Sequence, residues 1–256
     1  MVASESLVAQ APRVEAPVKW PVVLAVVLTA VLEVLDSTIV NVALPHLQAA
    51  FGIAADQTTW ILTSYIVAAI VVMPLTGLFA RWLGKRRLIT ISIVGFTVFS
   101  ALCGIAENIE MMVVCRLGQG LFGAFLIPLS QSTLMNAFPR DRRGQAMAMF
   151  GLGVIVAPIL GPTLGAVLTE HFSWRAVFYV NVPIAAFALM MISGELQREE
   201  TQKVAIDWTG LILMVLAIGC LQFVLDQGET RDWLESRVIQ VFVTVAALSA
   251  VLFVVR

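Results

Sequence analysis

Long apolar stretches separated by short polar clusters make up most of the chain. An α-helix needs about 20 apolar residues to cross a hydrocarbon core about 30 Å thick. Read with this length, the pattern predicts eight membrane-spanning helices, at roughly 21–43, 58–80, 88–106, 110–137, 144–169, 175–194, 207–226 and 237–256. We therefore expect an all-α integral membrane protein with short connections.

The composition agrees with lipid as the solvent. Hydrophobic residues make up 59% of the chain and charged residues only 13%, far from the balance of a soluble domain. The sequence has no HExxH, GxSxG or GxxxxGK[ST] motif and no cluster of His and Cys, so it predicts neither an enzyme nor a metal site. The three cysteines, Cys103, Cys115 and Cys220, lie in apolar stretches without CxxC pairing, which is typical of small core residues.

The distribution of basic residues predicts an orientation. If the N-terminus is cytoplasmic, twelve of the sixteen Lys and Arg residues fall on the cytoplasmic side and three on the other. Cytoplasmic loops of membrane proteins carry this excess of positive charge. We expect a multi-pass protein of the cytoplasmic membrane with both chain ends inside the cell.

A dense charge run between the sixth and seventh spans divides the chain. It predicts a cytoplasmic leader at 1–20, a six-helix bundle at 21–195, a charged cytoplasmic linker at 196–206 and two further helices at 207–256. The chain stops directly after its last apolar run, so we expect a truncation.

Three ionisable residues fall inside apolar runs. Glu33 and Asp36 are three residues apart on one face of the first span, and Arg116 lies within the fourth. Intramembrane charges are costly and often mark ion pathways. Estimated depths put Asp36 and Arg116 at a similar level, so one of the acids can pair with Arg116, and protonation of that acid would weaken the pair. Two alternatives are acids hydrated at the outer interface and a static pair that only fixes packing.

Two segments stand out by their glycines and prolines. The fifth span carries Gly153, Pro158, Gly161, Pro162 and Gly165, which predicts a bent helix whose small face lets a neighbour approach closely. The segment GLFARWLGKRR, at 77–87, predicts a basic loop between the second and third spans.

Together these segments resemble the fourteen-span drug:proton antiporter branch of the major facilitator superfamily. LDSTIVNVALP, at 35–45, is similar to its first-helix signature and contains Asp36. The resemblance extends to the cytoplasmic loop motif, with an arginine where the family has an aspartate, to the fourth-helix motif, and to the fifth-helix antiporter motif. The matching residues are Gly77, Arg81, Gly84, Lys85 and Arg86; Arg116, Gln119, Gly120 and Gly123; and Gly153, Pro158, Gly161, Pro162 and Gly165.

The resemblance implies the family's N-terminal six-helix bundle plus two additional transmembrane helices. It implies proton-coupled efflux of drugs or similar amphipathic small molecules, driven by the proton gradient without a cofactor, with Asp36, Glu33 and Arg116 in proton coupling. It allows a periplasmic adaptor and an outer-membrane channel as partners, and gives no reason to expect nucleic acid. Two alternatives stay open: an uptake symporter or facilitator of the same fold, and a half-transporter fragment that does not transport.

Overall fold

The computed structural model describes residues 20–195 and 207–256, with side chains up to 192 and from 207. All regular elements in these ranges are helices. They are α1 (Trp20–Phe51), α2 (Ala55–Val72), α3 (Thr76–Leu83), α4 (Lys85–Gly104), α5 (Ile109–Gly123), α6 (Leu126–Ala137), α7 (Arg143–His171), α8 (Ala176–Tyr179), α9 (Asn181–Glu195), α10 (Trp208–Gln227) and α11 (Arg237–Val255), with short 3₁₀ turns between some of them. The predicted leader, apart from its last residue, and the predicted linker lie outside the described residues.

Seven segments among the described residues are long and apolar enough to cross a membrane. The sixth predicted span is shorter, because its apolar part covers Ala176–Ile192 and the helix is interrupted at Val180 between α8 and α9. The other predicted spans are present, and several extend beyond the predicted ends. The prediction of an all-α membrane fold is confirmed.

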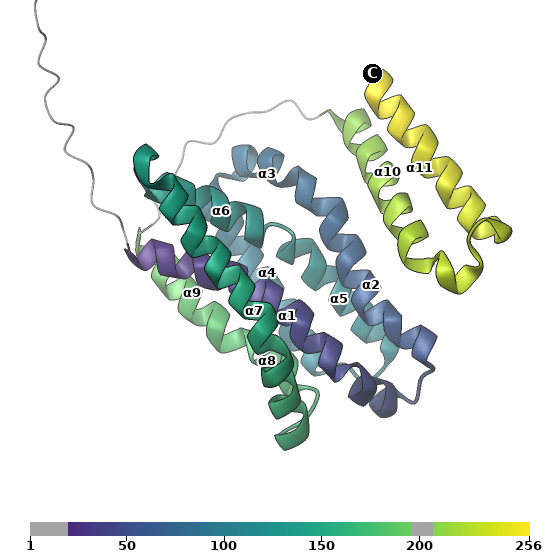
Figure 1. The fold of residues 1–256 in the computed structure, drawn as a ribbon, viewed down its shortest axis with the longest axis horizontal. Helices are drawn as coiled ribbons and strands as arrows, with labels where there is room; N and C mark the ends of the chain where they lie inside the picture. Colours follow the sequence, from purple (N-terminus) through teal and green to yellow (C-terminus); the bar gives the residue numbers. More distant parts are fainter. Residues whose placement is uncertain (1–19, 196–206) are drawn as a thin grey trace, which may run out of the picture.

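The long helix α1 lies at the centre of the bundle. It contacts α2, α6, α7, α8 and α9, and Figure 1 shows it running between these neighbours. Much of its length is buried, including fully enclosed residues such as Ala30, Leu32 and Ile39. A polar side chain on the inward face of α1 is therefore removed from lipid and water alike.

The fourth span is two helices rather than the single predicted one. The break follows α5 at Ala124 and Phe125, before α6 begins. Pro128 has no N–H to donate to the carbonyl of residue 124 and its ring crowds that carbonyl, which explains a break at this point. Leu129 is the residue whose N–H bonds back across the turn, to Phe125.

The predicted basic loop at 77–87 is mostly helical, so that prediction was wrong. Residues 76–83 form α3, and α4 starts at Lys85. Only Gly84 separates the two helices, with φ +80°, a conformation that glycine adopts without steric cost. A single residue thus turns the chain where we expected a loop.

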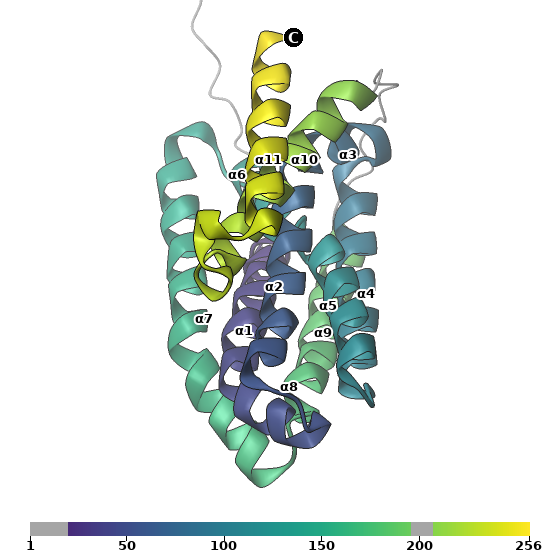
Figure 2. The same cartoon turned by 90° about the vertical axis from the view of Figure 1, so that its right-hand side faces the viewer.

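The last two helices form a hairpin beside α2. Figure 2 shows α10 and α11 in front of α2, on the flank of the bundle. The Phe223 and Phe242 rings stack across the hairpin with centroids 4.2 Å apart, and the Trp60 ring of α2 lies 6.3 Å from Phe223. These aromatic contacts fix one end of the hairpin to the bundle.

Candidate functional site

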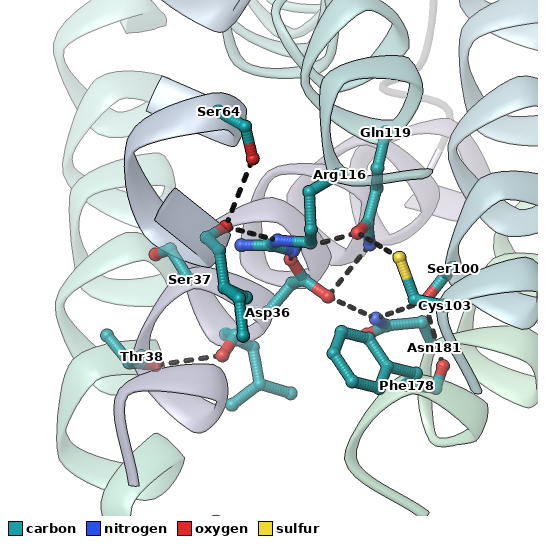
Figure 3. A network of polar contacts seen from close by, with 12 residues as sticks. Asp36, Ser37, Thr38, Ser64, Ser100, Cys103, Arg116, Gln119, Phe178 and Asn181 are labelled. Carbon is teal, nitrogen blue, oxygen red and sulfur yellow. Dashed lines mark hydrogen bonds and ion pairs between the residues drawn. The ribbon is translucent and has the colours of Figure 1, made fainter. Parts of the chain in front are cut away.

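A buried ion pair joins the first and fourth spans. Arg116 Nη1 donates to Asp36 Oδ2 over 2.7 Å, and both side chains are fully buried. Figure 3 shows the two side chains meeting between their helices. The sequence predicted that one acid of α1 could pair with Arg116, and the structure selects Asp36.

Two amides complete the coordination of the Asp36 carboxylate. Gln119 Nε2 and Asn181 Nδ2 both donate to Oδ1, over 2.9 and 2.6 Å. Gln119 also accepts from Arg116 Nη1 through Oε1, at 2.8 Å. The carboxylate therefore receives donors from the fourth and sixth spans at once, which links α1, α5 and α9.

The third span supports this network from behind. Asn181 Nδ2 also donates to Ser100 Oγ at 2.9 Å, and Ser100 donates to the backbone carbonyl of Phe178 at 2.8 Å. The sulfur of Cys103 lies 3.8 Å from Gln119 Oε1. All these side chains are buried, so the network is shielded from solvent on several sides.

Arg116 makes two further contacts with the second span. Its Nε donates to the carbonyl of Ile61 at 3.1 Å, and its guanidinium lies 4.4 Å from the centroid of the Tyr65 ring. Nη2 has no hydrogen-bond partner among the described residues. The arginine is thus held by α1, α2 and α5, with the two N–H groups of Nη2 left unused.

This geometry suits a charge that can be switched. A buried pair with good hydrogen bonds can be stable, but removing one charge leaves the other uncompensated in the interior. A proton on Asp36 would remove the negative charge and weaken the bonds from Arg116, Gln119 and Asn181 together. The arrangement also fits a static pair that fixes helix packing, so its role in coupling stays a prediction.

Glu33 occupies a different environment from Asp36. It is also buried, with 7% of its surface exposed, so the alternative of two acids hydrated at the interface is wrong. Glu33 makes no ion pair with Arg116 in the structure. Within the described part of the chain, its buried Oε2 has no hydrogen-bond partner.

The glycines of the fourth-helix motif bring α5 against α2. A Cβ at Gly120 would clash with the backbone oxygen of Tyr65, and one at Gly123 would lie 3.0 Å from Tyr65 Oη. Arg116 and Gln119, on the same helix, enter the ion-pair network. The motif therefore combines close packing with two polar side chains.

The fifth-helix glycines bring α7 against α1. A Cβ at Gly153 would lie 2.6 Å from Val27, one at Gly161 would clash with Thr38, and one at Gly165 would lie 3.2 Å from the carbonyl of Ile39. Pro158 and Pro162 are exposed on the other side of the same helix. The predicted close approach is present, and its partner is the helix that carries Asp36.

The residues of the loop motif lie apart from this network, around the junction of α3 and α4. Arg81 is exposed, and its Nε donates to the carbonyl of Gly77 one turn earlier. Gly84 forms the break, and Lys85 and Arg86 begin α4. The donors to Asp36 are Arg116, Gln119 and Asn181. The gating role of the loop motif therefore stays a prediction.

A family model described as Major Facilitator Superfamily matches residues 26–255. The chain belongs to the Major Facilitator Superfamily. This major facilitator chain is 39% identical over 235 residues to the "Multidrug export protein EmrB" of Haemophilus influenzae, covering 91% of the chain and 46% of that protein. It is 41% identical over 227 residues to the "Fatty acid resistance protein FarB" of Neisseria gonorrhoeae, covering 88% and 45%. It thus spans about half the length of the curated relatives it matches.

Solved structures show the same fold at low identity. The human organic anion transporter MFSD10 superposes with a TM-score of 0.65 at 21% identity, over 81% of this chain and 56% of that one. A D-xylose–proton symporter superposes with a TM-score of 0.62 at 14% identity, over 91% and 66%. The major facilitator fold is confirmed, and the chain belongs to a family of transporters and not of enzymes.

Sequence reasoning missed Asn181. The residue lies in the sixth predicted span, 175–194, in which the sequence predicted no functional residue. The available signal was a lone amide between apolar residues at the start of the sixth span, because a buried amide in lipid needs a partner. Its partner, Asp36, is 145 positions away in the sequence, so spacing gave no indication of the contact.

Proposed function

We propose that the protein takes part in proton-coupled efflux of drugs or similar amphipathic small molecules across the cytoplasmic membrane, with the N-terminus in the cytoplasm and the proton gradient as energy source. The observation that carries the proposal is the buried Asp36–Arg116 pair with its two amide donors. An intramembrane acid held by a cation on another helix can exchange a proton and change how the helices are joined.

The similarity to proteins named for multidrug export and fatty acid resistance supports amphipathic substrates and the outward direction. The excess of Lys and Arg near α3, α4 and the start of α7 supports a cytoplasmic N-terminus. A periplasmic adaptor and an outer-membrane channel are further proposed partners, in line with an export role.

Accumulation of a fluorescent lipophilic cation tests the proposal. Cells that express the protein should accumulate less of the dye than cells without it, and a proton uncoupler should remove the difference. Asp36→Asn should also abolish it, whereas Asp141→Asn should not, because Asp141 lies exposed between α6 and α7. Equal accumulation with and without the protein, or an Asp36→Asn variant that still exports, contradicts the proposal.

A further inference from the structure

An apolar pocket lies at the end of the bundle where α1 and α7 begin and α9 ends. Figure 1 shows these three helix ends on the same side of the molecule. The first two turns of α1, from Trp20 to Val27, form one wall, and Met149 of α7 and Met191 of α9 complete the lining. The cavity measures about 460 Å³, within the range of about 300–1,000 Å³ that is typical of small-molecule sites.

The lining of the pocket suits a hydrocarbon chain. Sites for drug-like molecules use a few polar groups to fix the orientation of the ligand, whereas no lining side chain here carries a charge or an amide. Val27 also precedes Asp36 by nine residues, about 14 Å along the axis of α1, so the pocket is separate from the buried ion pair. Trp20 is 57% exposed, and a tryptophan at the end of a membrane helix favours the level of the lipid headgroups.

A basic segment adjoins the pocket. The ring of Trp20 packs edge-on against the ring of Phe138, with centroids 6.4 Å apart. Two residues after Phe138 the chain enters the 3₁₀ turn Arg140–Arg142, and α7 begins at Arg143. Met149 of the pocket lining is six residues further on, about 9 Å along the helix axis. The arginines therefore lie about two helical turns from the pocket, on the side where α1 and α7 begin.

The positive charge of this segment exceeds its negative charge. The segment 140–143 contains three arginines and one acid, Asp141, which lies 3.7 Å from Arg142 on the exposed surface. The Nε atom of Arg143 is buried and has no hydrogen-bond partner among the described residues, and Arg140 is exposed. The start of α7 adds the partial positive charge of a long helix. A phosphate group, with several acceptor oxygens and a negative charge, matches these donors.

We propose that the pocket binds an acyl chain of an anionic phospholipid from the cytoplasmic leaflet, whose phosphate lies against Arg140 and Arg143. Basic pockets between membrane helices on the cytoplasmic side bind anionic lipid headgroups. An acyl chain packs about equally well against lipid and against protein, so the headgroup charge selects the lipid. The assignment to the cytoplasmic leaflet rests on the proposed orientation, whereas the cavity and the adjoining charge are properties of the chain itself.

Brominated lipids test the site, because bromine on an acyl chain quenches a tryptophan that it contacts and Trp20 lines the pocket. The purified protein is placed in phosphatidylcholine nanodiscs with rising fractions of brominated phosphatidylglycerol or, separately, of brominated phosphatidylcholine. The difference between the unchanged protein and Trp20→Phe isolates the signal of Trp20. Each arginine near the membrane surface favours an anionic lipid by about fivefold. Half-maximal quenching should therefore need about five- to thirtyfold less brominated phosphatidylglycerol than brominated phosphatidylcholine.

Two double variants locate the headgroup. Arg140→Gln combined with Arg143→Gln should remove the preference for phosphatidylglycerol and leave quenching by phosphatidylcholine unchanged. The matched control is Arg81→Gln combined with Arg87→Gln, which removes the same charge from exposed residues of α3 and α4 and should keep the preference. Equal quenching by the two lipids, or a preference that survives the changes at Arg140 and Arg143, would overturn the inference.

The same signal distinguishes other occupants of the pocket. If neither lipid quenches Trp20, protein covers the pocket and the lipid assignment is wrong. If a lipophilic cation displaces brominated phosphatidylglycerol and restores the Trp20 signal, the pocket binds substrate and the assignment is again wrong. Nanodiscs expose both leaflets and no transport is measured, so the result is independent of orientation and of export. Failure of dye efflux leaves the lipid site standing, and loss of the lipid preference leaves the proposed efflux standing.

Discussion

The six-span bundle of α1 to α9 and the hairpin of α10 and α11 are both strongly apolar but are held together differently. In α1, 61% of the most apolar window is buried inside the protein, against 11% in α10 and 17% in α11. The bundle therefore encloses polar groups at its centre, whereas the hairpin presents most of its surface outward. The side chains of the hairpin make few specific contacts with the bundle.

The polar contacts differ in the same way. In the bundle, Asp36 alone joins three spans through fully buried bonds. The hairpin meets α2 through one polar contact, in which Thr63 Oγ1 donates to Asp226 Oδ2, beside the aromatic contact of Trp60 with Phe223. Within a membrane, an apolar side chain packs about equally well against lipid and against protein. The buried polar bonds therefore fix one arrangement of the bundle. The hairpin, with a single polar contact to α2, is attached more weakly.

Breaking the central ion pair should have the largest effect. Arg116→Ala leaves the Asp36 carboxylate buried with only two amide donors, and loss of one partner of a buried pair costs about 3–5 kcal/mol. Thermal unfolding in detergent should show this loss, and Arg116→Ala combined with Asp36→Asn should recover part of it. A single variant as stable as the unchanged protein would show that the network does not hold the bundle.

Removal of the third donor should have a smaller effect. Asn181→Ala deletes one hydrogen bond to a charged group, worth about 1.5–3 kcal/mol, and leaves Arg116 and Gln119 in place. The matched control is Asn41→Ala, because Asn41 is exposed and bonds only to the backbone of Ser37. The same unfolding measurement should separate the two, and equal stability of both variants would contradict a structural role for Asn181.

The sequence predicted the membrane spans better than the helix breaks and side-chain contacts within the bundle. Apolar run length gave the spans because helix length and membrane thickness are directly linked. Depth along two helices was enough to suggest the pairing of Asp36 with Arg116. The choice between Asp36 and Glu33 was not predictable, because the two side chains share one face and point only about 60° apart, so the choice depends on how α1 is rotated toward α5.

The missed features have local or long-range causes. Pro128 was a signal for the break before α6. Because prolines are tolerated in membrane helices, the sequence predicted one continuous span at 110–137. The segment 77–87 was predicted as a loop because its four basic residues mark a membrane boundary without indicating backbone conformation. The contact between Thr63 and Asp226 joins residues 163 positions apart, and nothing in either segment indicates the other.

On the hairpin side, Thr63→Val should loosen the attachment to α2. The change removes the hydroxyl donor to Asp226 at nearly constant volume and should weaken docking by about 1 kcal/mol. Spin labels on α2 and α11 should show a broader distance distribution in this variant. Thr59→Val, one turn away, removes only an exposed bond to the backbone of Asp56 and should leave the distribution unchanged. An equally narrow distribution in both variants would mean that the aromatic contacts alone hold the hairpin.

The smallest effect should come from the open end of the hairpin, where Asp207 precedes α10. Its carboxylate accepts from the backbone N–H of Gly210 and pairs with Arg256 at 2.7 Å, and these contacts lower the pKa of Asp207, the N–H of Gly210 most strongly. A lowered pKa means that the stability contributed by the Asp207 carboxylate is present above the unfolded pKa of about 3.9 and is lost as the pH falls through the folded pKa.

Exchange of the first amides of α10, corrected for intrinsic rates, should therefore rise below pH about 4. Asp207→Asn retains a capping side chain without the charge and should remove this pH dependence, while Asp207→Ala should raise exchange at every pH. If Asp207→Asn still shows the acid transition, another group is responsible, and the ion pair with Arg256 contributes nothing to closing the hairpin.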